Sequence, residues 1–257
     1  MTIAPPDDRT PGRSRDEHHL AVQRFLQPDD VTCGPTCLRK VYHFYGLDIP
    51  VEAVAGEIDR NEDGGTLAVF LGISALQRGY GARIFAYDLN LFDPTWCTLP
   101  MREVSKKIQA RMPHLRTAKA MRAAGAYRRF LEMGGVLGCE ELTPGLLKQI
   151  INRDHPVLVG LSATHLYRMP RERQIEGTEQ LVDDDVAGEP TGHFVVISGY
   201  RRWGREFSVL DPSEHAPVAP DGRLWVDAQR LTNSILVGLL TSDAVLLEIW
   251  PESGVRA

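Results

Sequence analysis

Apolar side chains recur at helical spacing between residues 32 and 46 and predict the first helix of the chain. The apolar stripe consists of Cys37, Leu38, Val41, Tyr42 and Tyr45. Pro35 suits the first turn, where a missing N–H costs nothing, and Gly46 suits the position just beyond the last turn. The pattern therefore predicts a helix whose first turn holds Cys33.

The following stretch of chain mixes helical patterns with apolar strand patterns. Helices are predicted near 50–58, 66–78, 101–112 and 117–133, and a further one begins at Thr143–Pro144, a cap residue followed by a first-turn proline. Strands are predicted at 82–87 and over the strongly apolar stretch 156–163. Residues 93–138 are the part of this stretch whose pattern is least regular.

Residues 193–212 have the pattern of a β-hairpin. β-Branched and aromatic residues fill HFVVISGY (193–200) and EFSVLDP (206–212), and a turn at 202–204 separates them. With the turn there, the residue opposite His193 falls at about 211–214, which brings Asp211 close to it. Further strands are predicted at 223–226 and 244–250, with a short helix between them. Helices first and mostly antiparallel strands afterwards predict an α+β fold.

The distribution of apolar residues also suggests how the chain is organised. Residues 1–19 contain almost none and predict a disordered tail. Residues 20–257 are predicted to form a single domain with insertions near 93–138 and 164–191. The second insertion holds many charges and two prolines, which predicts a long surface loop. Such a loop either shapes a site or is a plain solvated insertion.

Composition limits the partners and the location of the protein. The chain is 43% hydrophobic and 25% charged, as in ordinary globular proteins, and its net charge is −5. That charge argues against nucleic acid or an anionic membrane as a partner, since both attract basic surfaces. No stretch is apolar enough to span a bilayer, and the N-terminus has no secretory h-region. These observations predict a cytoplasmic protein.

Cys33 is the residue that carries the strongest chemical prediction. Four cysteines in 257 residues do not indicate a disulfide scaffold, and a helix N-terminus favours the thiolate form, which is the nucleophile. Gly34 beside it is expected to leave room for a substrate at the sulfur. An attacked carbonyl needs a site for its oxyanion. We expect the Cys33 backbone N–H and the Gln27 side-chain amide to provide it.

The general base is sought among eight histidines. His193 differs from the others because it opens an otherwise apolar strand, on the same face as Val195 and Ile197. Asp211 would accept a hydrogen bond from the imidazole and fix its tautomer. Asp211 also has a simpler interpretation, as the residue that starts a turn before Pro212. The sequence thus predicts a Cys33–His193–Asp211 triad.

These motifs, taken in order, resemble those of the C39-like cysteine peptidases, relatives of the bacteriocin-processing peptidase domains. The resemblance rests on Gln27, on CGPTCL (33–38) with its apolar helix, on GHFVVISGY (192–200) and on VLDP (209–212). It implies a papain-like fold, in which the nucleophile helix packs on an antiparallel sheet. It also implies Gln27 as oxyanion donor, Cys33 as nucleophile, His193 as base and Asp211 as orienting acid. No P-loop ATPase motif or membrane span accompanies them, so leader cleavage after a double glycine does not follow.

Several other interpretations remain open at this stage. The same residues would support acyl transfer, and a C39-like module that binds a peptide without cutting it is a second alternative. A metal or redox site built on Cys33 and Cys37 lacks the usual paired histidines. We therefore predict no cofactor, no metal, and a peptide or protein substrate as the partner; the oligomeric state is not predicted. Cys37, Cys97 and Cys139 are expected to be buried core residues.

Overall fold

The computed structural model describes residues 16–61, 64–178, 180–219, 221–238 and 244–252. Its helices are α1 (Cys33–Phe44), α2 (Val51–Glu57), α3 (Ala68–Gln77), α4 (Met101–Arg111), α5 (Ala118–Glu132), α6 (Pro144–Asn152), α7 (Ala163–Tyr167) and α8 (Ala228–Val237). Short 3-10 helices are η1 (Pro94–Thr98), η2 (Met112–His114) and η3 (Arg202–Gly204). The strands are β1 (His18–His19), β2 (Tyr80–Ala86), β3 (Val136–Gly138), β4 (Val157–Ser162), β5 (Glu172–Gln174), β6 (Leu181–Asp183), β7 (Gly192–Arg201), β8 (Glu206–Leu210), β9 (Arg223–Asp227) and β10 (Val245–Pro251).

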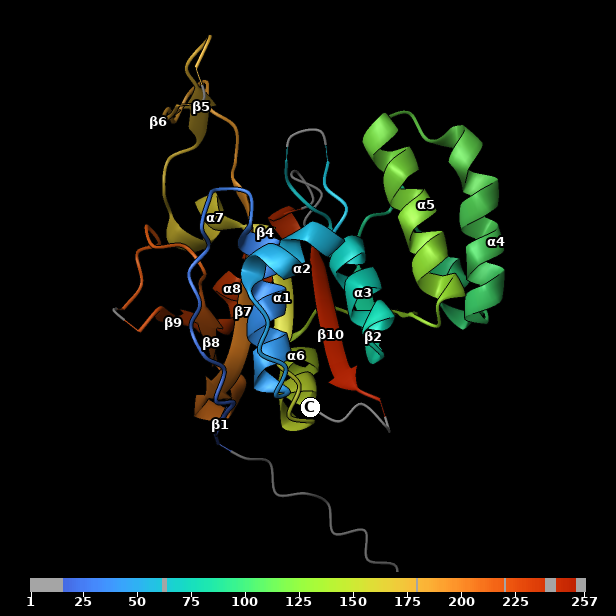
Figure 1. The fold of residues 1–257 in the computed structure, drawn as a ribbon, viewed down its shortest axis with the longest axis horizontal. Helices are drawn as coiled ribbons and strands as arrows, with labels where there is room; N and C mark the ends of the chain where they lie inside the picture. Colours follow the sequence, from blue (N-terminus) through green and yellow to red (C-terminus); the bar gives the residue numbers. More distant parts are fainter. Residues whose placement is uncertain (1–15, 62–63, 179, 220, 239–243, 253–257) are drawn as a thin grey trace, which may run out of the picture.

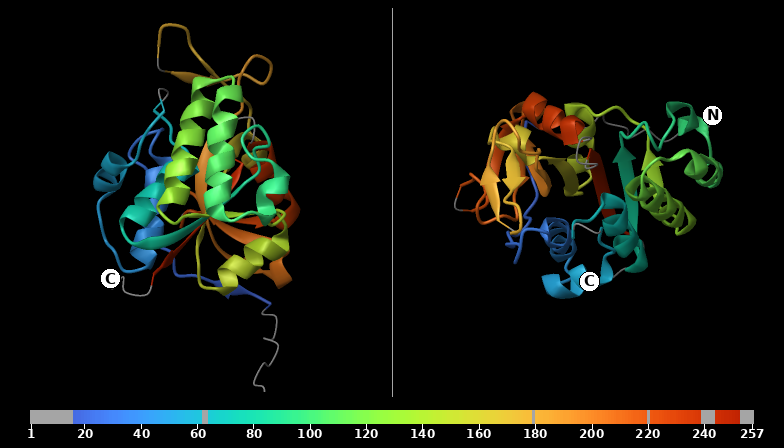
Figure 2. Two further views of the ribbon diagram at one scale, coloured as in Figure 1. Left: turned by 90° about the vertical axis from the view of Figure 1, so that its right-hand side faces the viewer. Right: turned by 90° about the horizontal axis from the view of Figure 1, so that it is seen from above.

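One large sheet organises the molecule. Its strand order is β3-β2-β10-β4-β7-β8-β9, and β1 pairs with β7. Within the described residues, all of its pairings are antiparallel except β2 with β3. Helices α1 and α3 cover one face and α8 the other, while the α4–α5 hairpin stands beyond the β3 edge (Figures 1 and 2). The predicted α+β fold, with the Cys33 helix packed on a largely antiparallel sheet, is confirmed.

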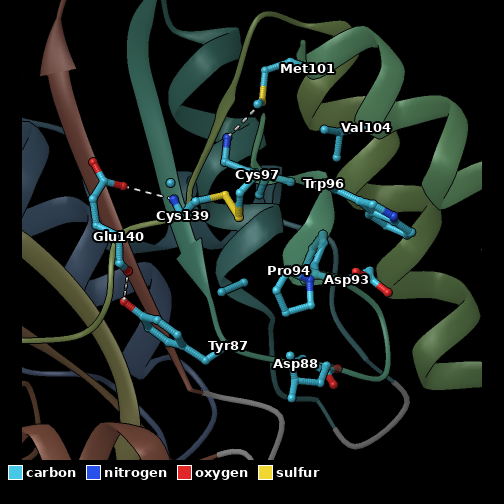
Figure 3. A pocket seen from close by; sticks show the side chains of 15 residues that line it. Tyr87, Asp88, Asp93, Pro94, Trp96, Cys97, Met101, Val104, Cys139 and Glu140 are labelled. Carbon is cyan, nitrogen blue, oxygen red and sulfur yellow. Dashed lines mark hydrogen bonds between the residues drawn. A yellow bond between two sulfur atoms is a disulfide. The ribbon is translucent and has the colours of Figure 1, made fainter. Parts of the chain in front are cut away.

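A disulfide between Cys97 and Cys139 ties η1 to the end of β3 (Figure 3). Both residues are exposed, so the prediction that they are buried core residues was wrong. Their α-carbons lie 5.6 Å apart although the residues are separated by 42 positions, a pairing that periodicity cannot indicate. Disulfides persist mainly in oxidising compartments, so this bond is unusual for the cytoplasmic location that the sequence predicts.

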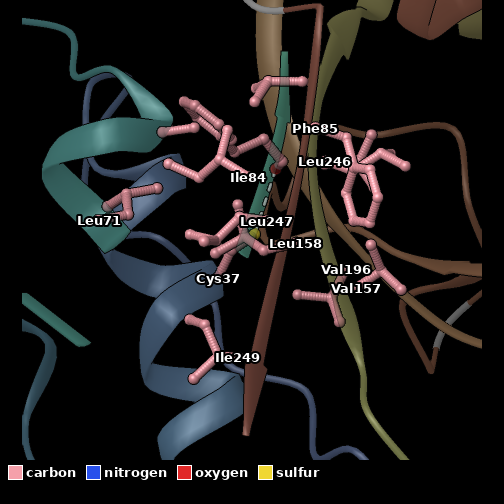
Figure 4. Packing of buried hydrophobic residues seen from close by; sticks show 14 of the residues in the cluster. Cys37, Leu71, Ile84, Phe85, Val157, Leu158, Val196, Leu246, Leu247 and Ile249 are labelled. Atoms are coloured by element: carbon pink, nitrogen blue, oxygen red, sulfur yellow. Dashed lines mark hydrogen bonds between the residues drawn. The ribbon is translucent and has the colours of Figure 1, made fainter. Parts of the chain in front are cut away.

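The core fills both sides of the central strands. Neighbouring residues in β2 and β10 point to opposite faces, and all of them are buried: Ile84, Phe85, Leu246 and Leu247. Figure 4 shows Ile84 on the α1 side of the sheet and Phe85 on the other side. A strand buried on both faces is apolar without alternation, as residues 245–247 of β10 are. The sheet is therefore the middle one of three layers.

The β7–β8 hairpin forms as the sequence predicts. Arg201 pairs with Glu206, and Val196 pairs with Leu210 beyond an irregularity between Ile197 and Gly199. Asp211 follows the last paired residue of β8 directly. The register therefore brings Asp211 to the end of the sheet at which His193 lies.

Two predicted irregular regions contain regular structure. Most of the predicted tail, residues 1–15, lies outside the described residues, but His18 and His19 already pair with Tyr200 and Gly199. Ordered backbone thus begins before Leu20. The region 164–191, predicted to be a loop, overlaps helix α7 and forms a small sheet of β5 and β6. The strand residues there are too few to show a period of two.

None of the helices in the part of the chain that the structure describes has both the length and the apolar character of a membrane-spanning segment.

Candidate active site

Cys33 is the first residue of α1, as predicted. The helix starts without a side-chain cap, and its first backbone hydrogen bond runs from the Thr36 N–H to the Thr32 carbonyl, at 2.9 Å. The N–H groups of a first turn have no partner within the helix and face whatever lies before it. The Cys33 sulfur and N–H therefore lie where a helix N-terminus favours negative charge.

Gly34 has a different role from the expected one. A Cβ at this position would lie 2.7 Å from the Thr66 Cγ2 atom and 3.3 Å from the Phe194 ring. Gly34 is buried, so the missing side chain lets α1 approach the start of β7 rather than opening space for a ligand. This close approach positions Cys33 beside His193.

His193 is the second residue of β7 and contacts Asp211. Its Nε2 lies 3.0 Å from Asp211 Oδ1 and 3.1 Å from Oδ2, which leaves Nδ1 for another partner. The Cys33 thiol acts on the same imidazole: its hydrogen-bonding capacity and its charge both raise the pKa of His193. The His193 side chain is 12% exposed and that of Asp211 is 0% exposed. The structure thus brings together three predicted residues from α1, β7 and the end of β8.

The charges of this cluster depend on one another. Burial disfavours the imidazolium, but the hydrogen bond and the negative charge of Asp211, with a smaller contribution from Cys33, raise the pKa of His193 to about 10. Burial also acts to raise the pKa of Asp211, yet the bonds that this carboxylate accepts hold its pKa below the ordinary value. At neutral pH the pair is therefore an imidazolium and a carboxylate.

Asp211 has two further donors that the sequence does not reveal. The Tyr167 hydroxyl donates to Oδ2, and the Ser213 backbone N–H donates to Oδ1 at 2.6 Å. Burial and the Asp211 charge raise the pKa of Tyr167, so its hydroxyl keeps its proton. Tyr167 ends helix α7, within the region predicted to be a loop. No motif marks it, because only the folded chain brings α7 beside β8.

Gln27 also lies beside this cluster. Its backbone N–H donates to the Pro212 carbonyl at 2.9 Å, so the entry loop runs along the end of β8. The side-chain oxygen is buried and has no hydrogen-bond partner among the described residues. The position agrees with the expected oxyanion role of Gln27, which stays a prediction.

Two other groups on α1 are buried near the cluster. Cys37 is fully buried, as predicted; its thiol donates to the Phe194 carbonyl at 3.2 Å, and burial raises its pKa. Lys40 is also fully buried, and its Nζ has no hydrogen-bond partner in the described part of the chain. Burial lowers the pKa of Lys40, although Cys37 and Asp211 act in the opposite direction. No three His, Cys, Asp or Glu side chains among the described residues form a cluster suited to a metal ion.

Comparison with known proteins gives similar structures but no similar sequences. No protein-family model matches the chain, and no curated protein matches it. A candidate C39-like peptidase from Bacillus anthracis is similar with a TM-score of 0.47 and 13% identity, over 93% of this chain and 100% of the other. Xylellain, a cysteine protease from Xylella fastidiosa, has a TM-score of 0.45 and 16% identity, over 93% and 87%. A double-glycine-motif protease from an AMS/PCAT transporter, in complex with a leader peptide, has a TM-score of 0.44 and 14% identity, over 91% and 95%.

Proposed function

We propose that this protein is a cysteine peptidase or amidase that cleaves a peptide or amide bond through a thioester on Cys33. The observation that carries the proposal is the His193 imidazole, which is hydrogen-bonded to the buried Asp211 carboxylate and whose pKa Cys33 also raises; the three side chains come from three separate elements. Burial of a carboxylate is costly unless hydrogen bonds and an opposite charge compensate it, and three donors, from His193, Tyr167 and Ser213, do so at Asp211. Here the carboxylate fixes the imidazole beside a thiol at a helix N-terminus.

The chemistry follows from these positions. In the resting pair His193 Nδ1 already holds the thiol proton as an imidazolium, and the Cys33 thiolate attacks the carbonyl carbon of the substrate. The Cys33 N–H and the Gln27 side-chain amide donate to the oxyanion that forms. The C–N bond then breaks, the amine leaves with the proton from His193, and a water molecule hydrolyses the thioester with His193 again as base. Asp211, held by Tyr167, stabilises the imidazolium throughout.

The first test measures how reactive Cys33 is. Intact protein is treated with limiting iodoacetamide from pH 5 to 8, and modified peptides are mapped. Cys37 is buried and Cys97 and Cys139 are joined, so selectivity for Cys33 would follow from exposure alone. The informative quantities are the rate below pH 7 and its dependence on His193. We expect fast alkylation that falls by roughly tenfold or more at pH 6 in His193→Ala, because the thiolate loses its partner.

His114→Ala is the matched control, since His114 lies in η2 between α4 and α5. Equal rates at pH 6 in all three proteins would count against an activated pair. A second test incubates a tryptic peptide library from a cell lysate with wild type and with Cys33→Ala. Cleavages made by wild type alone would support hydrolysis. An activated thiol without any cleavage would leave the non-catalytic peptide-binding module as the better explanation.

A further inference from the structure

A cavity lies away from Cys33, between the ends of β2 and β3, the 3-10 helix η1 and the start of α4 (Figure 3). Its volume is about 310 Å³, within the roughly 300–1,000 Å³ typical of small-molecule sites. None of Cys33, His193, Asp211 and Gln27 lines it. The cavity therefore needs an explanation independent of the proposed function.

Apolar and aromatic side chains form the walls of this cavity. The lining includes Phe92, Trp96, Met101, Val104 and Leu137, and also Leu89, which is 74% exposed. The Cys97–Cys139 disulfide forms one wall and fixes η1, which carries Trp96, against β3. A preformed, covalently braced apolar cavity binds an apolar group with little ordering cost.

The charged side chains that line the cavity are all negative. Three carboxylates line it, those of Asp88, Asp93 and Glu140, and none of the described lining residues is Lys, Arg or His. Figure 3 shows Asp88 and Asp93 on one side of the cavity and Glu140 on the other. Hydrogen bonds from the Thr95 side chain and backbone lower the pKa of Asp93, with a smaller contribution from Lys107, so this carboxylate is charged at neutral pH. The lining is therefore complementary to a cation.

Trp96 differs from the other three tryptophans in the charged groups that lie over its ring. Lys148 lies over Trp203 at 5.6 Å, Arg201 over Trp225 at 4.2 Å and Arg83 over Trp250 at 6.0 Å. Within the described ranges, no cationic side chain of the protein lies over the Trp96 ring. An indole face in an acidic, apolar cavity is well suited to an organic cation.

From these observations we infer that the cavity beside Trp96 is a binding site for a small organic cation, an ammonium group carried on an aromatic or branched apolar body. The apolar body contacts Met101, Val104 and Leu137. The ammonium group contacts the Trp96 ring and the carboxylates of Asp88 and Asp93, which lie on one side of the cavity. Binding there requires no catalysis at Cys33.

The test uses three probes of one shape: 4-phenylbutylamine, the neutral 4-phenylbutan-1-ol and the anionic 4-phenylbutyrate. Protein labelled with ¹³C at methionine methyls is titrated at pH 7 and followed by NMR, because Met101 lines the cavity. Met101→Leu assigns its signal. We expect a saturable shift of the Met101 signal with the amine, an affinity at least about fivefold weaker with the alcohol, and no saturation with the carboxylate.

Variants then separate charge from shape. Asp88→Asn and Trp96→Leu are expected to reduce the preference for the amine over the alcohol by roughly threefold or more. Trp203→Leu is the matched control, since Trp203 is 60% exposed at the β7–β8 turn and should change nothing. The inference is overturned if the Met101 signal does not shift in wild type, or if the alcohol binds as tightly as the amine. The wild-type comparison of probes decides this even where a variant fails to fold.

Discussion

The cluster around His193 and the cavity around Trp96 lie at the same ends of the strands of the main sheet but are built in opposite ways. Ala86, at the end of β2 beside the cavity, pairs with Val245, which pairs with Gly160, which pairs with Phe194 next to His193. Polar groups buried within the cluster satisfy one another through hydrogen bonds. Apolar walls form the cavity, and three carboxylates line it with no cationic side chain among the described lining residues.

The difference shows how each place is stabilised. The cluster depends on hydrogen bonds between elements that pack together in any case, because α1, β7 and β8 belong to the core. The cavity depends on one covalent bond and on the α4–α5 hairpin, which lies outside the central layers. Substitutions that disrupt the cluster around His193 should therefore leave the cavity around Trp96 intact, and the reverse should also hold.

The largest effect is expected from Asp211→Asn. Removing the charge should lower the His193 pKa from about 10 towards its ordinary value of 6.5. A fall of about three units in the His193 pKa corresponds to roughly 4 kcal/mol. Because the pKa is raised in the folded protein, its stabilisation is complete below pH 6.5 and is lost as the pH rises towards 10. The wild-type free energy of unfolding should fall over this range, and that of the variant should change less.

NMR titration of the His193 ring and denaturant unfolding between pH 6 and 10 measure both quantities. Asp185→Asn is the control, since Asp185 is exposed and lies next to β6. A wild-type His193 that titrates near 6.5 would contradict the ion pair. The pKa of Asp211 is lowered rather than raised in the folded protein. Its contribution to stability is therefore lost only as the pH falls below the ordinary carboxyl range.

The double variant Cys97→Ala/Cys139→Ala should have the next largest effect. The disulfide joins residues 42 positions apart, and opening a loop of that length lowers the free energy of unfolding by about 2–4 kcal/mol. Denaturant unfolding measures this loss. Alkylation of Cys33 by iodoacetamide should keep its wild-type rate and pH profile, because the disulfide touches nothing around His193. A slower alkylation would show that the two places are coupled.

The smallest effect is expected from Lys40→Met, which should raise the free energy of unfolding. The buried amine has a lowered pKa, so the folded protein pays for a charge that the unfolded chain carries freely at neutral pH. Methionine keeps most of the side-chain volume without the charge, and the free energy of unfolding should rise by about 1 kcal/mol. Lys40→Ala should lower it by about 2 kcal/mol or more through a cavity. Calorimetry on both variants checks the order; a destabilised Lys40→Met would indicate a bound partner for Nζ.

The sequence predicts the cluster far better than the cavity. The apolar stripe after Cys33, the proline of its first turn and the alternation around the 202–204 turn are local signals, and each element formed where expected. The hairpin register alone placed Asp211 near His193. The catalytic roles of these residues and of Gln27 stay predictions.

Pairings between distant segments were the part that could not be predicted. Tyr167 reaches Asp211 across 44 positions from a five-residue helix, too short to show a helical period. Cys97 and Cys139 lie in segments without a regular pattern, so nothing indicated that their α-carbons would meet. The cavity could not be predicted for the same reason, since η1, β3 and α4 form it together.

The place of β7 within the sheet has a consequence for local opening. β7 pairs with β4 on one side and β8 on the other, and its last residues also pair with β1, so its backbone amides are held by three neighbouring strands. Such amides exchange with solvent hydrogen only when most of the molecule unfolds, whereas those of the separate β5–β6 sheet exchange through small openings. We therefore expect the middle and end of β7 to belong to the slowest-exchanging unit of the fold, whereas His193, near its start, pairs with Leu161 of β4 before the pairing with β8 begins at Val196.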